Sequence, residues 1–136
     1  MTEDRSDYLL HRIRRAFETL HEAELLLNSG MIAGSVNRIY YACFYAVSAL
    51  LTSEGHFSAR HGGVISLFDQ HWIKPGRMPK EVGAFYHLIF NRRQKSDYED
   101  LLPPDPARAM EWLNEARSLV ERAADWLRTN AGIDLG

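Results

Sequence analysis

The segment from about Ala33 to Ser53 constrains the fold more than any other part of this sequence. It carries no charged residue between Arg38 and Glu54, and its apolar and aromatic side chains recur at helical spacing on more than one face. A helix that is apolar all round must be covered on all sides. We therefore expect this segment to be central in the fold, or to lie between the core and a subunit interface, with Gly55 at its end.

Four further segments have the spacing of amphipathic helices, and no segment has the pattern of a strand. They run from about Ser6 to Asn28, from Val64 to Trp72, from Pro79 or Lys80 into the basic segment after Phe90, and from Asp105-Pro106 to about Arg128. Short loops between long amphipathic helices are typical of an antiparallel bundle. The predicted fold is all-α, a five-helix antiparallel bundle in one domain over residues 1–136, with a core at about 5–128 and a flexible tail at 129–136.

Composition limits the classes of protein to consider. A chain of 136 residues with 46% hydrophobic and 25% charged residues is typical of a single soluble globular domain. Its net charge of -2 argues against coating nucleic acid by bulk electrostatics, but leaves room for a small basic site. No apolar stretch approaches the roughly 20 residues that span a bilayer, and the acidic N-terminus is not a secretory signal. We expect a cytoplasmic protein that does not contact membranes.

No metal site and no cofactor are expected. Cys43 is the only cysteine and lies among apolar residues, where a buried structural thiol is usual. The six histidines lack the spacing and the companion carboxylates of a metal site. The pair Gly62-Gly63 precedes a helix, but the strand and the lysine of a phosphate-binding loop are missing.

Residues 91–98 place three cations beside a carboxylate and a phenol, directly after an apolar run. Arg93 and Asp97 are four residues apart, so in a continuous helix they could form a surface ion pair of roughly 0.3–0.5 kcal/mol. The three cations exceed what Asp97 alone can neutralise. A guanidinium fork also suits phosphate geometry, and Tyr98 offers a ring on which a base could stack. The segment is therefore either an ordinary helix end or a site for an anion.

Arg38 is the lone charge at the start of the apolar helix. Such a residue needs a carboxylate, an array of carbonyls or a bound anion, because an unpaired buried charge costs several kcal/mol. The second and fourth helices should be neighbours, which would bring Asp97 or a bound phosphate within reach. Asn37 and Tyr41 lie four residues apart and would flank the same spot. A tie between Arg38 and Asp97 that holds the helices in register and a binding role both remain open.

Three motifs in this order make the chain resemble the HEPN domain family, and most closely its bacterial and archaeal branch. They are Arg38-Ile39-Tyr40-Tyr41-Ala42-Cys43-Phe44, then Arg60-His61-Gly62-Gly63-Val64, then Arg92 or Arg93 with Asp97-Tyr98. The resemblance covers about residues 5 to 128. It implies a helical bundle that usually dimerises with the fourth-helix motif near the dimer axis, and an association with RNA cleavage and with nucleotidyltransferase partners.

The resemblance also implies how ribonucleolytic members work. In them an Arg steadies the phosphate, and a His separated from it by four to six residues assists the attack of the ribose 2′-hydroxyl without metal. Here those positions hold Asp97, Tyr98, Glu99 and Asp100, and none is His. An Asp with a pKa of about 4 is a poor proton donor at neutral pH, and a Tyr with a pKa of about 10 is a poor base. We expect little or no ribonuclease activity, with Asp97 and Tyr98 as the acting groups if any remains.

The expected function is binding of a nucleotide or single-stranded RNA by a homodimer. The resemblance adds a nucleotidyltransferase-like partner protein in a toxin–antitoxin or defence setting. The proposed roles are phosphate binding by Arg38, Arg92 and Arg93, contact with base or sugar by Tyr41 and Tyr98, and orientation of the arginines by Asp97. Two alternatives remain open: a divergent metal-independent ribonuclease that uses the same residues, and a structural interaction protein in which Arg38 and Asp97 only tie helices together.

Overall fold

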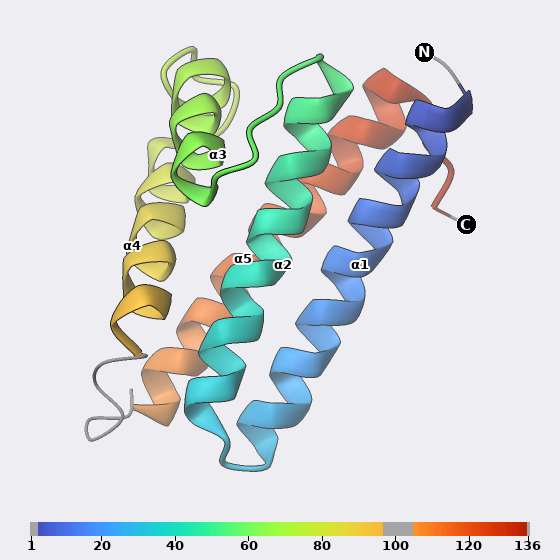
Figure 1. The fold of residues 1–136 in the computed structure, drawn as a ribbon. Helices are drawn as coiled ribbons and strands as arrows, with labels where there is room; N and C mark the ends of the chain where they lie inside the picture. Colours follow the sequence, from blue (N-terminus) through green and yellow to red (C-terminus); the bar gives the residue numbers. More distant parts are fainter. Residues whose placement is uncertain (1–2, 97–104, 136) are drawn as a thin grey trace.

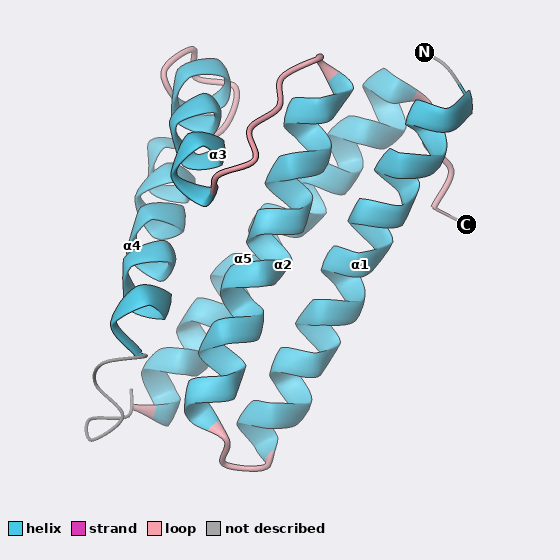
Figure 2. Cartoon of the chain, viewed as in Figure 1, coloured by secondary structure: helices cyan, strands magenta, loops and turns pink. Residues whose placement is uncertain are grey.

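The computed structural model describes residues 3–96 and 105–135, which form five helices and no strand (Figure 1, Figure 2). The helices are α1 (Glu3–Asn28), α2 (Ile32–Ser53), α3 (His61–Phe68), α4 (Lys80–Ser96) and α5 (Pro106–Ala131), and α3 continues directly into a turn of π-helix, η1 (Asp69–Ile73). In Figure 1, α1, α2 and α5 run side by side, with α3 and α4 along the other side of α2. The prediction of an all-α five-helix bundle is confirmed.

The ends of α3 and α5 differ from the sequence-based expectation. We expected the third helix to begin at Val64, but it begins three residues earlier, at His61. Gly62 and Gly63 therefore lie in the first turn of the helix, where the backbone N–H groups have no partner within the helix. The fifth helix starts as predicted, with the Asp105 side chain accepting a hydrogen bond from the Ala107 N–H. It continues past Arg128 to Ala131, where Gly132 ends it at φ 65°.

The second helix is central, as its all-round apolar pattern predicts. It contacts α1, α5, α4 and α3, and its fully buried side chains include Val36, Ile39, Tyr40, Cys43, Val47 and Leu50. Burial raises the pKa of the Cys43 thiol, which suits a structural role inside the core. Of the aromatic residues on α2, only Tyr41, Phe44 and Tyr45 remain half-buried.

The π-helical turn η1 carries a tryptophan that joins three parts of the bundle. Trp72 is 1% exposed, and its ring meets that of Trp126 on α5 edge to face at 4.9 Å. The Arg77 guanidinium lies 3.6 Å above the Trp72 ring and donates hydrogen bonds of 2.8 and 2.9 Å to the two carboxylate oxygens of Glu54. That hydrogen bonding holds the pKa of the Glu54 carboxyl below its usual value. The end of α2 is thereby fixed to the turn before α4.

A glycine sets how closely α4 approaches η1. A Cβ atom at Gly83 would lie 2.9 Å from Cγ1 of Ile73, which is closer than real side chains approach. Because the position has no side chain, the start of α4 packs directly on η1. This close packing helps to set where the far end of α4, with its arginines, meets α2.

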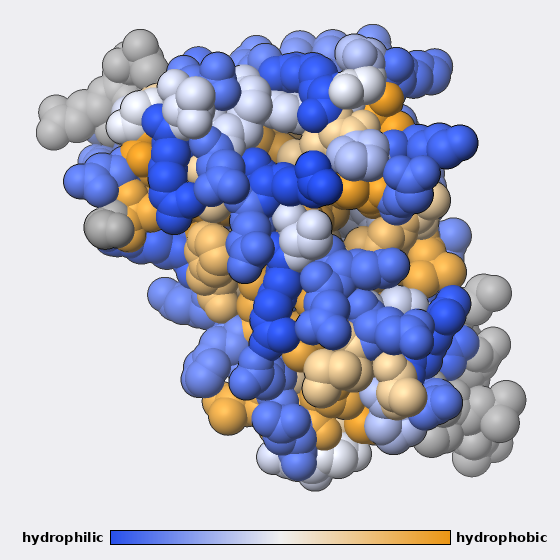
Figure 3. Space-filling model, turned by 180° about the vertical axis from the view of Figure 1, so that it is seen from behind, coloured by the Kyte–Doolittle hydropathy of each residue, from blue (hydrophilic) through white to orange (hydrophobic). Residues whose placement is uncertain are grey.

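The surface on the far side of the bundle is mainly polar. Seen from behind, hydrophilic side chains cover most of the molecule, and hydrophobic ones form small areas between them (Figure 3). No helix in the described ranges is long and apolar enough to cross a membrane.

Candidate functional site

Arg93, near the end of α4, reaches across to two tyrosines of α2. Its Nη2 donates a 2.8 Å hydrogen bond to the hydroxyl of Tyr41. Its guanidinium carbon lies 5.2 Å from the centre of the Tyr40 ring and 5.0 Å from the centre of the Tyr41 ring, which is within cation–π range. The guanidinium of Arg93 is therefore held in place by both rings.

Arg38 contacts the same Tyr41 ring from within α2, with its guanidinium carbon 5.0 Å from the ring centre. Its Nε and Nη2 donate to Oδ1 of Asn37 at 3.2 and 2.9 Å, and its Nη1 lies 3.6 Å from Oε1 of Glu22 on α1. Arg38 thus has the carboxylate that an Arg in an apolar helix requires, and the carboxylate comes from α1. The pKa of Glu22 is lowered, first by its hydrogen bond from Arg15 and then also by the charges of Arg15 and Arg38.

His61, the first residue of α3, lies against this cluster and was not among the predicted site residues. Its Nδ1 is 2.6 Å from the hydroxyl oxygen of Tyr40. Its ring stacks on the ring of Phe44, with the ring centres 4.3 Å apart and an angle of 12° between the ring planes. Burial, and then the charge of Arg93, lowers the pKa of His61. The sequence contained a signal for it, because His61 is part of the second motif of the resemblance. Nothing in the sequence placed it beside Tyr40, 21 residues away.

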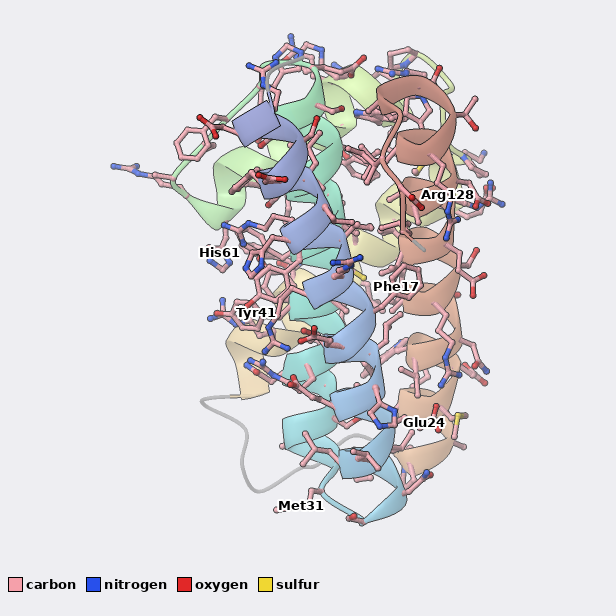
Figure 4. All side chains as sticks on the ribbon, turned by 90° about the vertical axis from the view of Figure 1, so that its right-hand side faces the viewer. Phe17, Glu24, Met31, Tyr41, His61 and Arg128 are labelled. Atoms are coloured by element: carbon pink, nitrogen blue, oxygen red, sulfur yellow. The ribbon has the colours of Figure 1, made fainter. Side chains whose placement is uncertain are left out.

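The half-buried rings of Tyr41, Phe44 and Tyr45 form what we call the aromatic ridge of α2. Arginine side chains lie over both of its tyrosines: Arg38 and Arg93 over Tyr41, and Arg12 and Arg15 over Tyr45 at 5.4 and 5.7 Å. Figure 4 shows Tyr41 and His61 on one side of the bundle and Arg128 on the other. Aromatic rings interleaved with guanidinium groups can stack with nucleobases and hold phosphates.

The other predicted site residues are placed differently or lie outside the described residues. The guanidinium carbon of Arg92 lies 6.0 Å from the ring of Trp112 on α5, so the neighbouring arginines of α4 contact different helices. Asp97 and Tyr98 fall outside the described ranges, and so do the expected pairings of Asp97 with Arg38 and Arg93. Asn37, Arg38, Tyr41 and Arg93 are therefore the predicted residues that the structure brings together.

The surroundings of the ridge bear on what could bind there. A cavity of about 40 Å³ lies next to Phe44, lined also by Tyr8 and Phe57. This volume is far below that of a usual small-molecule pocket, which is about 300–1,000 Å³. A ligand of nucleotide size would have to lie on the ridge itself. Among the residues that the structure describes, no group of three or more His, Cys, Asp or Glu side chains could hold a metal ion.

Comparisons with known proteins agree with the fold. Residues 9–126 match the family model of the HEPN domain. The chain is 39% identical to a UPF0332 protein of Thermotoga maritima over 108 residues, which are 79% of this chain and 82% of the relative. Two proteins of Methanocaldococcus jannaschii are also similar. "Putative toxin MJ0142" is 29% identical over 85% of this chain and 78% of its own length, and "Putative toxin MJ0605" is 30% identical over 81% of each. Since the family model covers nearly all of the helical bundle, this chain belongs to the HEPN domain family.

Proposed function

We propose that the aromatic ridge and its arginines bind a nucleotide or single-stranded RNA. The observation that carries this proposal is the arrangement at Tyr41. The guanidinium carbons of Arg38 and Arg93 each lie 5.0 Å from the centre of that one ring, so they are at most twice this distance apart. A phosphate bound at this ring would interact with the guanidinium of Arg93, whose planar donor fork matches its oxygens, and Arg38 adds a second positive charge at the same ring. The exposed part of the Tyr41 ring would contact a base or the sugar.

The charges around the ridge favour weak rather than tight binding. Glu22 already interacts with Arg38 and Arg15, so only part of the positive charge is available to a ligand. The affinity for single-stranded RNA should decrease with salt, with a logarithmic slope of about -0.7 for each phosphate contacted. A site of this size would contact only a few phosphates, so the slope should be shallow. From the sequence we add Arg92 to the phosphate-binding residues, Tyr98 to those that contact base or sugar, and Asp97 as the residue that orients the arginines.

Replacing Arg93 with Ala should weaken binding of a fluorescein-labelled oligouridylate by about 1–2 kcal/mol, the size of one charge-assisted hydrogen bond. The matched control is Arg128→Ala, which removes the same side chain from the opposite side of the bundle, where Arg128 pairs with Asp125 on its own helix (Figure 4). Fluorescence anisotropy at two salt concentrations would measure both affinities. Equal binding by the wild type and by an Arg92/Arg93 double Ala variant would rule the site out.

We further propose that the chain acts with a nucleotidyltransferase-like partner in a toxin–antitoxin or defence setting. The names of the two Methanocaldococcus relatives support a toxin-like role, and the partner is implied by the family resemblance. The neighbouring gene gives the direct test. If it encodes a small nucleotidyltransferase, co-expression of the two chains should yield a stoichiometric complex. A neighbouring nucleotidyltransferase that does not associate with this chain would contradict the partnership.

We also propose that the protein is a homodimer that buries surface from α2 and α4. Met31, directly before α2, is 59% exposed and Leu88 on α4 is 41% exposed, so apolar side chains outside the ridge remain at both helices after the bundle is packed. Light scattering at roughly tens of micromolar should give twice the 15.6 kDa mass of one chain. A single-chain mass at that concentration would contradict the dimer.

A further inference from the structure

We infer that His61 is a further ligand-binding group of this site, and that it takes up a proton when a phosphodiester of single-stranded RNA binds beside Arg93. The inference rests on the proposed function and extends it, because it makes binding at the ridge sensitive to pH. It also gives a role to a residue of α3 in a site that the sequence located on α2 and α4.

The contacts of His61 fix which part of its ring is available to a ligand. One face of the ring is stacked on Phe44, and Nδ1 is taken up by the hydroxyl of Tyr40 at 2.6 Å. Nε2 is the ring nitrogen for which the described residues supply no hydrogen-bond partner. A phosphate oxygen would therefore be contacted through Nε2. The centre of the Tyr41 ring lies 5.8 Å from that of His61, with the two ring planes nearly perpendicular.

The hydrogen bond to Tyr40 can persist whether His61 is neutral or charged. Burial raises the pKa of the Tyr40 phenol well above its usual value, so its hydroxyl keeps its proton. A protonated phenol can either donate or accept a hydrogen bond. It donates to Nδ1 while the imidazole is neutral, and it accepts from Nδ1 once the imidazole is protonated. In both states Nε2 carries a hydrogen and can donate to phosphate.

The charges that face His61 explain why a ligand would change its protonation. From α2 it meets the uncharged Tyr40 and Tyr41, from α4 it faces the positive charge of Arg93, and its chain neighbour Arg60 is exposed. Burial is the larger cause of its lowered pKa and Arg93 the second, so the free protein should hold His61 neutral at physiological pH. A phosphodiester beside Arg93 would offset that positive charge and supply a negative one. Both effects favour the imidazolium.

The direction of the pH dependence follows from this coupling. The pKa of His61 is low in the free protein and higher in the complex, so the complex binds more protons over the interval between the two values. The affinity should be highest below the free-state pKa, decrease as the pH rises through the interval, and level off above the pKa of the complex. Each pKa unit between the two states corresponds to about a ten-fold change in affinity.

The experiment uses a labelled oligouridylate without a terminal phosphate, whose internal phosphodiesters do not titrate near neutral pH. Its affinity is measured at constant ionic strength from about pH 5 to 8, the range in which histidine titrates, for the wild type, His61→Gln and His21→Gln. His21 is an exposed histidine of α1, which makes His21→Gln the matched control. We expect the affinity of the wild type and of His21→Gln to decrease about three- to ten-fold over this range, and that of His61→Gln to stay constant.

An NMR titration of the wild-type imidazole signals gives a second measurement that needs no folded variant. The His61 signal, assigned by its loss in His61→Gln or by through-bond correlation, should titrate below pH 6.5 in the free protein and at a higher pH with saturating oligonucleotide. If His61→Gln does not fold, this titration decides alone.

The outcomes separate the two proposals. If Arg93→Ala weakens binding while His61→Gln keeps the pH dependence of the wild type, the inference is overturned and the proposed function stands. If saturating RNA leaves the pH at which His61 titrates unchanged, the inference is likewise overturned and the proposed function stands. If the wild type does not bind the oligonucleotide at any pH, both proposals are wrong.

Discussion

The variant Trp72→Ala is expected to lose about 3–5 kcal/mol of the free energy of unfolding, the usual cost of deleting a buried tryptophan side chain. Residue Trp72 is 1% exposed, and its ring centre lies 4.9 Å from that of Trp126 on α5. The guanidinium carbon of Arg77 lies 3.6 Å from the centre of the same Trp72 ring. Its removal would leave a cavity and would also release Arg77 from the ring that holds it toward Glu54. Urea unfolding followed by circular dichroism at helix wavelengths would measure the loss.

Trp72→Phe is the matched control for this cavity. The indole N–H is buried and finds no hydrogen-bond partner among the described residues, so Phe removes an unsatisfied donor together with one ring. The two effects oppose each other, and we expect Trp72→Phe to lose less than half as much stability as Trp72→Ala. Equal losses in the two variants would show that the indole N–H has a partner and that lost volume is not the main cause.

Purified wild-type protein is expected to show little or no ribonuclease activity. A positioned general acid–base group typically accelerates such a reaction by about 100- to 10,000-fold, and the positions at which the resemblance implies a His hold Asp97, Tyr98, Glu99 and Asp100 instead. Arginines that position a phosphate could leave a small residual rate. A fluorescence-quenched single-stranded RNA, incubated with protein and a metal chelator, would measure the rate.

The variants distinguish the possible sources of any cleavage. If phosphate positioning is the source of a residual rate, that rate should fall in Arg93→Ala, because the guanidinium of Arg93 lies over Tyr40 and Tyr41 at the site. Brisk cleavage that Asp97→Asn or Tyr98→Phe abolishes would contradict the expectation and support the ribonuclease alternative. Creation of strong cleavage by Asp97→His would support a site that is intact but lacks its proton-transfer group.

The fold could be predicted because each helix carries its own signal. The all-round apolar pattern of α2 required a central position, and Asp105-Pro106 marked the start of α5. The π-helical turn η1 was not predicted, because one extra residue in a single turn leaves no periodic pattern to detect. Its effect is local but real, since it carries Trp72 into contact with α5.

Helical spacing predicted the part of the site on α2, and the expected pairing of the second and fourth helices predicted Arg93 beside it. Asn37, Arg38 and Tyr41 lie within little more than one turn, so helical spacing alone brings them together. Contacts between helices depend on packing, which spacing does not encode. For this reason the sequence indicated neither Glu22 as the carboxylate of Arg38 nor His61 as the partner of Tyr40.

Figure 1 shows a division of the bundle that bears on its motions. Among the described residues, α1, α2 and α5 contact one another extensively, whereas α3 and α4 contact the rest mainly through α2. Elements with fewer contacts open at a lower free energy in the native state, so α3 and α4 should open before the other three helices. Tyr41 lies on the well-packed part, and Arg93 and His61 lie on the part that opens. A ligand that needs all three residues binds only the closed arrangement, so its binding free energy opposes this local opening.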